Sequence, residues 1–90
     1  MSKTNQIKKL AQDGLYYLTE HALHEALLDN FDVYDVEYAL MTGTMRRSWP
    51  HEQKYEIVAD ALDGRPIGII CRITPSNKVR VITVYEDRAR

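Results

Sequence analysis

The sequence predicts an α+β fold in which N-terminal helices pack on a three- to four-stranded antiparallel sheet. Up to about residue 43, apolar residues recur with helical spacing, whereas from residue 55 they alternate with polar residues or form runs rich in Ile and Val. Turn-forming residues separate the strand-like runs, which favours a meander of hairpins. Helices segregated from strands in this way cover one sheet face and leave the other at least partly open.

The length and composition indicate one globular domain. The chain has 90 residues, of which 44% are hydrophobic and 28% charged. A chain of this size buries one small core, so residues 1–90 are predicted to form a single domain. Its longest apolar runs are four or five residues, too short to span a membrane, and Lys8 and Lys9 lie where a signal peptide needs an apolar centre. We therefore expect a cytoplasmic protein with no membrane partner.

Charge is distributed unevenly along the chain. The formal net charge of −1 argues against a nonspecific nucleic-acid binder, which usually carries a basic excess. Between Asp13 and Glu37 there are seven acidic residues and no Lys or Arg, whereas the part from Arg46 onward carries nine of the twelve basic residues and six acids. The predicted strand half is thus the half that can hold an anionic substrate.

Three helices are predicted, each from apolar residues three and four apart next to a capping residue. The first covers residues 3–13, the second begins after its N-cap Thr19, and the third begins after Asp32, whose companion Asp35 makes a weak capping box. The residues expected to face the core are Ile7, Leu10 and Ala11 in the first helix, Leu23, Ala26 and Leu27 in the second, and Val33, Val36, Leu40 and Met41 in the third.

Several extended segments are predicted before the C-terminal hairpin. Residues 15–18 contain two aromatics and favour a short strand after Gly14. Residues 44–49 are expected to be extended, because proline at the next position disfavours a helical conformation. Residues 55–62 alternate between a less polar and a mixed face, and the Asp63-Gly64 pair that follows is a strong hairpin turn signal.

The last two strands are predicted to form a hairpin over residues 66–85, and the positions of its charges indicate the register. With a three-residue loop, Thr74 pairs with Lys78, and Arg72 lies opposite Arg80. A loop of two or four residues would bury charged side chains without partners. In the predicted register Ile73, Cys71 and Ile69 lie beside Val79, Val81 and Thr83 on the apolar face, and Ile70, Ile82 and Val84 lie with the arginines on the other face.

The pairing of Arg72 with Arg80 has a consequence for function. Two like charges directly across a ladder repel each other and weaken the strand pairing. Either carboxylates from another element neutralise the two guanidinium groups, or the groups form a site for an anion. A solvated sheet face is the structural alternative.

Several short motifs follow one another in an order that resembles a known family. They are Thr19, His21-Ala22, Val36, Gly43, Tyr55, Gly64 and the closing Ile82-Thr83-Val84-Tyr85. The order and spacing resemble the bacterial domain of unknown function 4258, over about residues 15–87. The resemblance implies similarity to the small RelE and BrnT-like toxins, which have a sheet flanked by N-terminal helices. It also implies an antitoxin protein as partner and a metal-independent ribonuclease activity that needs no cofactor.

The chain departs from this family on the helix after the His-Ala pair. Family members commonly place arginines there, and this sequence has Glu25 and Asp29 at the corresponding positions. The charge beside the implied site is therefore reversed.

The candidate catalytic residues are His21, Arg72, Arg80 and Tyr85. Metal-free RNA cleavage needs a base for the 2′-hydroxyl, a cation for the charge on phosphorus and an acid for the leaving oxygen. Histidine is the residue type suited to exchanging a proton near neutral pH, so His21 can serve as the base, and the two arginines can hold a phosphate with bidentate hydrogen bonds. Tyr85 can donate a proton or stack on a base. Arg46 and Arg47 extend the path for an anion.

Each candidate also has a structural interpretation. His21 is a surface residue in that interpretation, Tyr85 closes the core, and Cys71 fills the core of a strand. His21, His24 and Glu25 share a helix face, but their order lacks the usual spacing of a zinc site.

The alternative function is a noncatalytic protein-interaction domain. It forms a homodimer through its last strand or through Tyr34, Tyr38 and Trp49, the first two of which lie four residues apart on a predicted helix.

Overall fold

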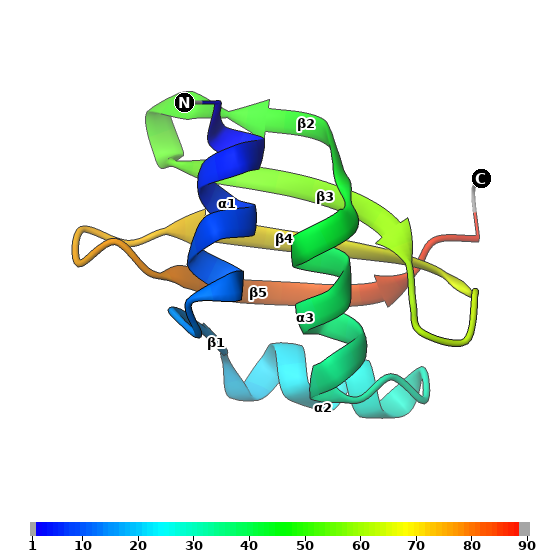
Figure 1. Cartoon of the computed structure of the whole chain (residues 1–90). Coiled ribbons are helices and arrows are strands. Elements are labelled where there is room, and N and C mark those ends of the chain that lie inside the picture. The colour runs from blue at the N-terminus through cyan, green and yellow to red at the C-terminus, as the bar shows by residue number, and fades with distance from the viewer. Residues whose placement is uncertain (1, 89–90) are drawn as a thin grey trace.

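The computed structural model describes residues 2–88, which form helices and one mixed sheet (Figure 1). The helices are α1 (Lys3–Gln12), α2 (Glu20–Leu28), α3 (Val33–Thr42) and the short 3-10 helix η1 (Pro50–Glu52). The strands are β1 (Tyr16–Leu18), β2 (Thr44–Trp49), β3 (Lys54–Asp60), β4 (Pro66–Ile73) and β5 (Val79–Glu86). No helix among the described residues has the length and apolar character needed to cross a bilayer.

The α+β class is confirmed, but the sheet has five strands instead of three or four. Their order is β1-β5-β4-β3-β2, and the last four strands of the chain form the expected antiparallel meander. The short strand predicted after Gly14 does form, and it pairs parallel to β5 with Tyr17 opposite Arg80. The last strand of the chain is therefore flanked by β1 along Val79–Val81, and a homodimer formed by pairing through that strand stays a prediction.

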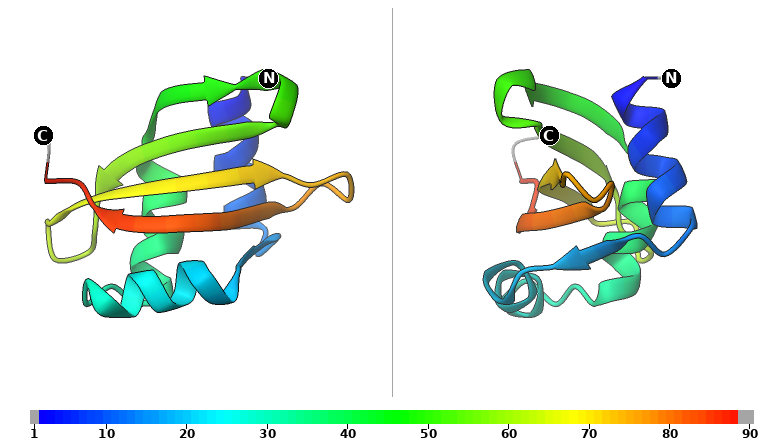
Figure 2. Two further views of the ribbon diagram at one scale, coloured as in Figure 1. Left: turned by 180° about the vertical axis from the view of Figure 1, so that it is seen from behind. Right: turned by 90° about the vertical axis from the view of Figure 1, so that its left-hand side faces the viewer.

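The core lies between the sheet and two of the helices. Helices α1 and α3 run side by side over one sheet face, and the views from behind and from the side show the opposite face without them (Figures 1 and 2). The first helix buries Ile7, Leu10 and Ala11 as predicted. Cys71 of β4 is fully buried, and this burial raises the pKa of its thiol to about 12, which fits a residue that fills the core.

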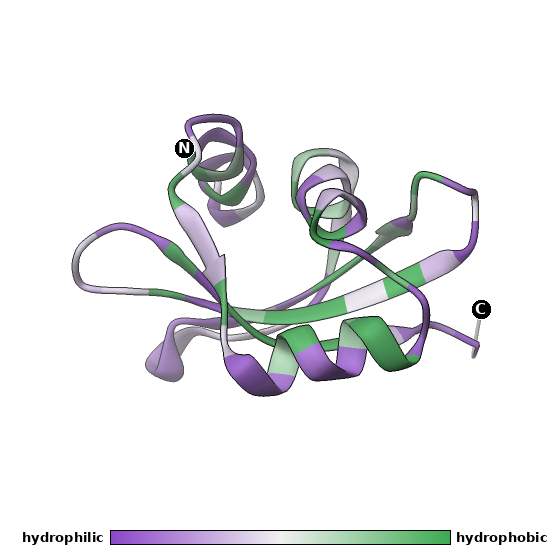
Figure 3. Cartoon of the chain, turned by 90° about the horizontal axis from the view of Figure 1, so that it is seen from below, coloured by the Kyte–Doolittle hydropathy of each residue, from purple (hydrophilic) through white to green (hydrophobic). Residues whose placement is uncertain are grey.

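Helix α2 lies apart from α1 and α3, alongside β5 (Figure 3). It faces the sheet with Ala22 and Ala26, which are fully buried, whereas Leu23 and Leu27 are exposed. The prediction that these leucines face the core was wrong, because small side chains let the helix approach β5 closely. The other contact is polar: Glu25 Oε1 accepts a hydrogen bond from the Val84 N–H at 3.3 Å.

The predicted helix starts are confirmed. The Thr19 hydroxyl accepts a hydrogen bond from the Ala22 N–H at 3.1 Å. At the start of α3, Asp32 accepts bonds from the N–H groups of Tyr34 and Asp35, and the Asp35 carboxylate accepts from the Asp32 N–H. This is a complete capping box, which satisfies donors that a helix start otherwise leaves unpaired.

The hairpin register is confirmed near the turn. Thr74 pairs with Lys78 through a backbone bond of 2.8 Å, Ile73 lies opposite Val79, and Arg72 lies opposite Arg80.

Further along the hairpin the register shifts by one residue, and the prediction there was wrong. A bulge at Ile82 places Val84 instead of Thr83 beside Ile69. Val84 is buried and Thr83 is not. The bulge thus brings an apolar side chain into the core and turns Tyr85 to the open face.

Candidate functional site

One row of side chains crosses the open face of the sheet near the β4–β5 turn. The strand register places Trp49 of β2, Lys54 of β3, Arg72 of β4, Arg80 of β5 and Tyr17 of β1 opposite one another in that order. Residues directly opposite on neighbouring strands point to the same face. The row, which we call the basic row, therefore presents three cations between two aromatic rings.

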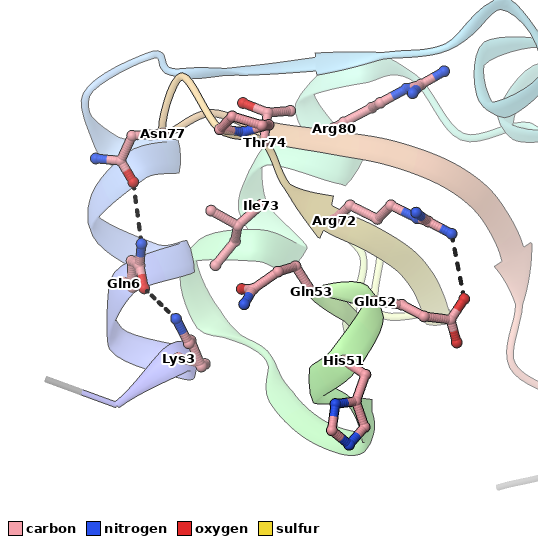
Figure 4. Close-up of a pocket in the computed structure, with 11 residues that line it drawn as sticks. Lys3, Gln6, His51, Glu52, Gln53, Arg72, Ile73, Thr74, Asn77 and Arg80 are labelled. Atoms are coloured by element: carbon pink, nitrogen blue, oxygen red, sulfur yellow. Dashed lines mark hydrogen bonds and ion pairs between the residues drawn. The ribbon is translucent and has the colours of Figure 1, made fainter.

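Two members of the basic row border a hollow of about 750 Å³ (Figure 4). Arg72 and Arg80 extend in the same direction from neighbouring strands. The first turn of α1, the η1 helix and the β4–β5 turn complete the wall. Gln6 of α1 donates a hydrogen bond of 3.1 Å to Asn77 of the turn, which ties these two parts of the wall together.

The two arginines differ in their partners. Arg72 Nη2 lies 3.5 Å from Glu52 Oε1, and because both side chains are about half exposed this ion pair is weak. The Arg80 side chain is exposed and makes no hydrogen bond or ion pair with any other described residue. Of the two like charges predicted to face each other across this ladder, only the charge of Arg72 therefore has an acidic partner.

His21 lies in the first turn of α2, outside the residues that line the hollow. Its Nε2 is 3.4 Å from Glu25 Oε1, and its side chain is 70% exposed. Two residues earlier, the Thr19 N–H donates to the carbonyl of Val81, the neighbour of Arg80. The chain thus brings the start of α2 to β5 next to the end of the basic row, and a carboxylate lies near the exposed imidazole. The structure describes no direct contact between His21 and Arg80.

Tyr85 lies on the open face but does not line the hollow. Its hydroxyl donates to Glu56 Oε1 at 2.5 Å and accepts from Arg46 Nη2 at 2.7 Å. Burial, followed by the bond to Glu56, raises the pKa of Tyr85 to about 12. The structure therefore does not bring Tyr85 to the two arginines of the hollow, and it engages the hydroxyl elsewhere.

A network of acids and arginines surrounds the Tyr85 hydroxyl. Glu56 is 2% exposed and accepts hydrogen bonds from Arg47 at 2.7 Å and from Arg46 at 3.1 Å, while Arg46 also donates to the buried Asp87 at 2.9 Å. The bond from Arg47, supported by those from Arg46 and Tyr85, holds the pKa of Glu56 well below its usual range. Arg46 and Arg47 are thus neutralised within the protein and do not extend a path for an anion.

Sequence reasoning missed five members of these two clusters. Trp49 was assigned only to a dimer interface, and no role was given to Tyr17, Lys54, Glu56 and Asp87. A signal was present, because Glu56 alternates with the buried Tyr55 and Ile57 and so belongs to the open face. What could not be predicted is that Glu56 is covered by arginines from the neighbouring strand.

The described residues contain no group of three or more His, Cys, Asp or Glu side chains arranged to hold a metal ion. Among the histidines, His51 lines the hollow from η1. It lies at the rim in Figure 4, next to Glu52.

Comparison with known proteins identifies a family but no characterised relative. No curated protein and no solved structure matches the chain. A family model described as Domain of unknown function (DUF4258) matches residues 18–86, which include the last residue of β1, all of α2 and α3, and every later strand. The chain therefore belongs to the DUF4258 family.

Proposed function

We propose that the chain is a toxin-type ribonuclease of RelE-like architecture that binds single-stranded RNA across the basic row and cleaves it without a metal ion. The observation that supports this proposal is the pair formed by Arg80 and Arg72, which lie directly opposite each other on β5 and β4 and line the same hollow, the Arg80 side chain having no partner among the described residues. A phosphate bound between them would relieve their mutual repulsion and accept bidentate hydrogen bonds.

The composition of the basic row favours single-stranded nucleic acid over a duplex. Bases of a single strand are free to stack on exposed aromatic rings, while lysine and arginine hold its phosphates. The exposed Tyr17 and the half-buried Trp49 stand at the two ends of the row, with Lys54 4.8 Å and Arg47 5.5 Å from the centroid of the Trp49 ring. This local surface is basic even though the formal charge of the whole chain is −1.

The cleavage step in this proposal uses an imidazole. His21, which lies near Glu25, takes the proton of the RNA 2′-hydroxyl, and the 2′-oxygen then attacks phosphorus. Arg72 and Arg80 stabilise the negative charge that develops on the phosphoryl oxygens. The bond to the 5′-oxygen breaks, and that oxygen takes up a proton from the imidazolium or from water. The products are a 2′,3′-cyclic phosphate and a 5′-hydroxyl end.

As a toxin of this kind the protein would act on RNA in the bacterial cytoplasm and would be held inactive by an antitoxin protein. Induced expression is then expected to arrest growth.

The test combines cleavage and binding measurements on the purified chain. Labelled single-stranded RNA is expected to be cut, whereas the same sequence with 2′-O-methyl groups binds but stays intact. Arg80→Ala should weaken binding of the methylated strand about tenfold, since one charge-assisted phosphate contact is lost. His21→Ala should abolish cleavage and leave that binding unchanged, and His51→Ala tests whether the imidazole at the rim is needed instead.

Lys9→Ala is the matched control, because Lys9 is an exposed cation on α1 outside the hollow. It should change neither binding nor cleavage. Equal binding by Arg80→Ala and Lys9→Ala would show that the basic row does not hold RNA. Binding without cleavage by the unchanged chain would reduce the function to an RNA-binding domain.

A further inference from the structure

The outer side of the helical half carries exposed apolar residues that the ribonuclease proposal does not use. Leu27 and Leu28 at the end of α2 are 59% and 68% exposed, and Leu23 lies one turn before Leu27 on the same stripe. At the start of α3, Tyr34 is 66% exposed and Val33 is exposed as well. We call these five residues the α2–α3 corner.

A tight connection keeps the two ends of this corner together. Asn30 ends α2 in a left-handed conformation, with φ 59°. The Phe31 N–H then donates to the Ala26 carbonyl at 2.8 Å, and the Phe31 ring is buried. These are the contacts of a Schellman motif. Only four residues separate Leu28 from Val33, so the apolar side chains of both helices belong to one region of the surface.

The helices that carry the corner are acidic. Residues 10–45, which include all of α2 and α3, contain seven acids and no Lys or Arg. One cation from outside this range, Arg65, reaches the connection, where it donates to the carbonyls of Asp29 and Asn30 and pairs with Asp63. Exposed apolar side chains on predominantly acidic helices are typical of a surface that binds a partner of opposite charge. A second copy of the chain docked through the same surface would bring acid against acid.

We propose that the α2–α3 corner is a docking surface for a basic amphipathic segment of a partner protein. Apolar side chains of that segment cover the leucines and Tyr34, and its lysines or arginines lie against the acids of the two helices. The surface lies on the helices, whereas the basic row lies on the open sheet face, so this inference does not depend on the ribonuclease proposal.

Two synthetic peptides serve as probes for this chemistry. Both are amphipathic helices of about 18 residues, or five turns, with the same leucines, and one carries lysines where the other carries glutamates. Titrated into the isotope-labelled full chain, the lysine peptide is expected to shift the backbone amide signals of α2 and of the first turn of α3. The glutamate peptide should leave them unchanged. Added salt should weaken the complex, because the attraction between exposed charges is screened.

A double variant and its control locate the contact. Leu27→Ser with Leu28→Ser changes two exposed residues and should weaken binding of the lysine peptide at least about tenfold. Leu15→Ser, at an exposed leucine between α1 and β1, should leave the affinity unchanged. Circular dichroism confirms that both variants keep the fold.

Three results would overturn the proposal. The first is equal binding of the two peptides, and the second is a set of shifts outside the α2–α3 corner. The third is a dimer of the free chain, seen by light scattering, that Leu27→Ser with Leu28→Ser dissociates, because the corner would then bind a second copy.

Discussion

The ring of Tyr85 occupies the space in which a side chain at Gly68 would lie. The two residues are paired across β4 and β5, and a Cβ atom added at residue 68 would overlap the ring carbons of Tyr85. Only glycine lets the tyrosine cross β4 on the open face. The hydroxyl thereby reaches Glu56 on β3. Gly68 has no side chain, and this lack of a side chain is what allows Tyr85 to join the buried carboxylate network.

Gly68→Ala is therefore expected to destabilise the protein. The new methyl group must displace the Tyr85 ring, which costs about 1–3 kcal/mol for overpacking and removes the hydrogen bond to Glu56. Urea denaturation followed by circular dichroism measures the change in the free energy of unfolding. In a Tyr85→Ala background the same glycine substitution should cost much less, because the ring is gone. An equal cost in both backgrounds would mean that the overlap with Tyr85 is not the cause.

The buried carboxylate of Glu56 makes a second prediction possible. Glu56→Ala removes the charge-assisted hydrogen bonds from Arg46, Arg47 and Tyr85 and should lower the free energy of unfolding by about 2 kcal/mol, since the arginines that remain reach solvent. Glu52→Ala removes an exposed carboxylate that faces Arg72 and should change the free energy of unfolding by less than about 0.5 kcal/mol. Similar losses for the two variants in urea denaturation would contradict the assigned burial.

The lowered pKa of Glu56 also predicts how stability depends on pH. Its carboxylate is ionised in the folded protein at pH values where the unfolded chain, with a glutamate pKa of about 4.3, already binds a proton. The stabilisation is therefore complete above about pH 4.3 and is lost as the pH falls below that value towards the folded pKa. Thermal melting between about pH 6 and pH 3 should show this decline. Glu56→Gln, which binds no proton, should show a shallower one.

Replacing Arg80 should raise the stability of the fold and lower its affinity for RNA. Because it lies directly across from Arg72, Arg80→Thr removes a like-charge contact and introduces a residue favoured in strands. The free energy of unfolding should rise by roughly 0.5 kcal/mol, while the affinity for a methylated RNA strand falls. Chemical denaturation measures the free energy of unfolding, and fluorescence anisotropy on the same samples measures the affinity for RNA. A loss of stability would indicate that Arg80 has a structural role.

Local sequence rules predicted the helix caps and the hairpin register close to its turn. The caps depend on Thr19 and Asp32 and their own neighbours, and the turn depends on residues within a few positions of Asn77, which adopts the left-handed conformation with φ 62°. Such interactions can be deduced from sequence because every participant is close along the chain.

The features that sequence analysis missed depend on contacts between distant segments. The parallel pairing of β1 with β5 joins Tyr17 to Arg80, and the Glu56 network joins β2, β3 and the end of β5. The predicted orientation of α2 was wrong, because hydrophobicity alone favoured burying Leu23. The helix instead packs on β5 through alanines and places acidic side chains against the edge of that strand.

This placement of α2 leads to a last prediction. Beyond Val81 the outer edge of β5 has no strand partner among residues 2–88. Its N–H groups at Val84 and Glu86 donate to the carboxylates of Glu25 and Asp29 at 3.3 and 3.0 Å. Side chains of a helix thus satisfy donors that a free sheet edge would leave open to another chain.

Replacing Glu25 and Asp29 together by alanine should release both N–H groups. Hydrogen exchange at Val84 and Glu86 is then expected to accelerate by about tenfold or more, since each amide loses its only strong acceptor. Exchange at Val79 should stay slow, because its N–H donates to the Leu15 carbonyl. Glu37→Ala, which removes an acid on α3 that binds Tyr16, is the matched control and should leave Val84 and Glu86 protected. If Glu37→Ala accelerates exchange equally, the protection comes from the overall packing of the helices and not from the two carboxylates. Glu25 and Asp29 would then have no part in covering this strand.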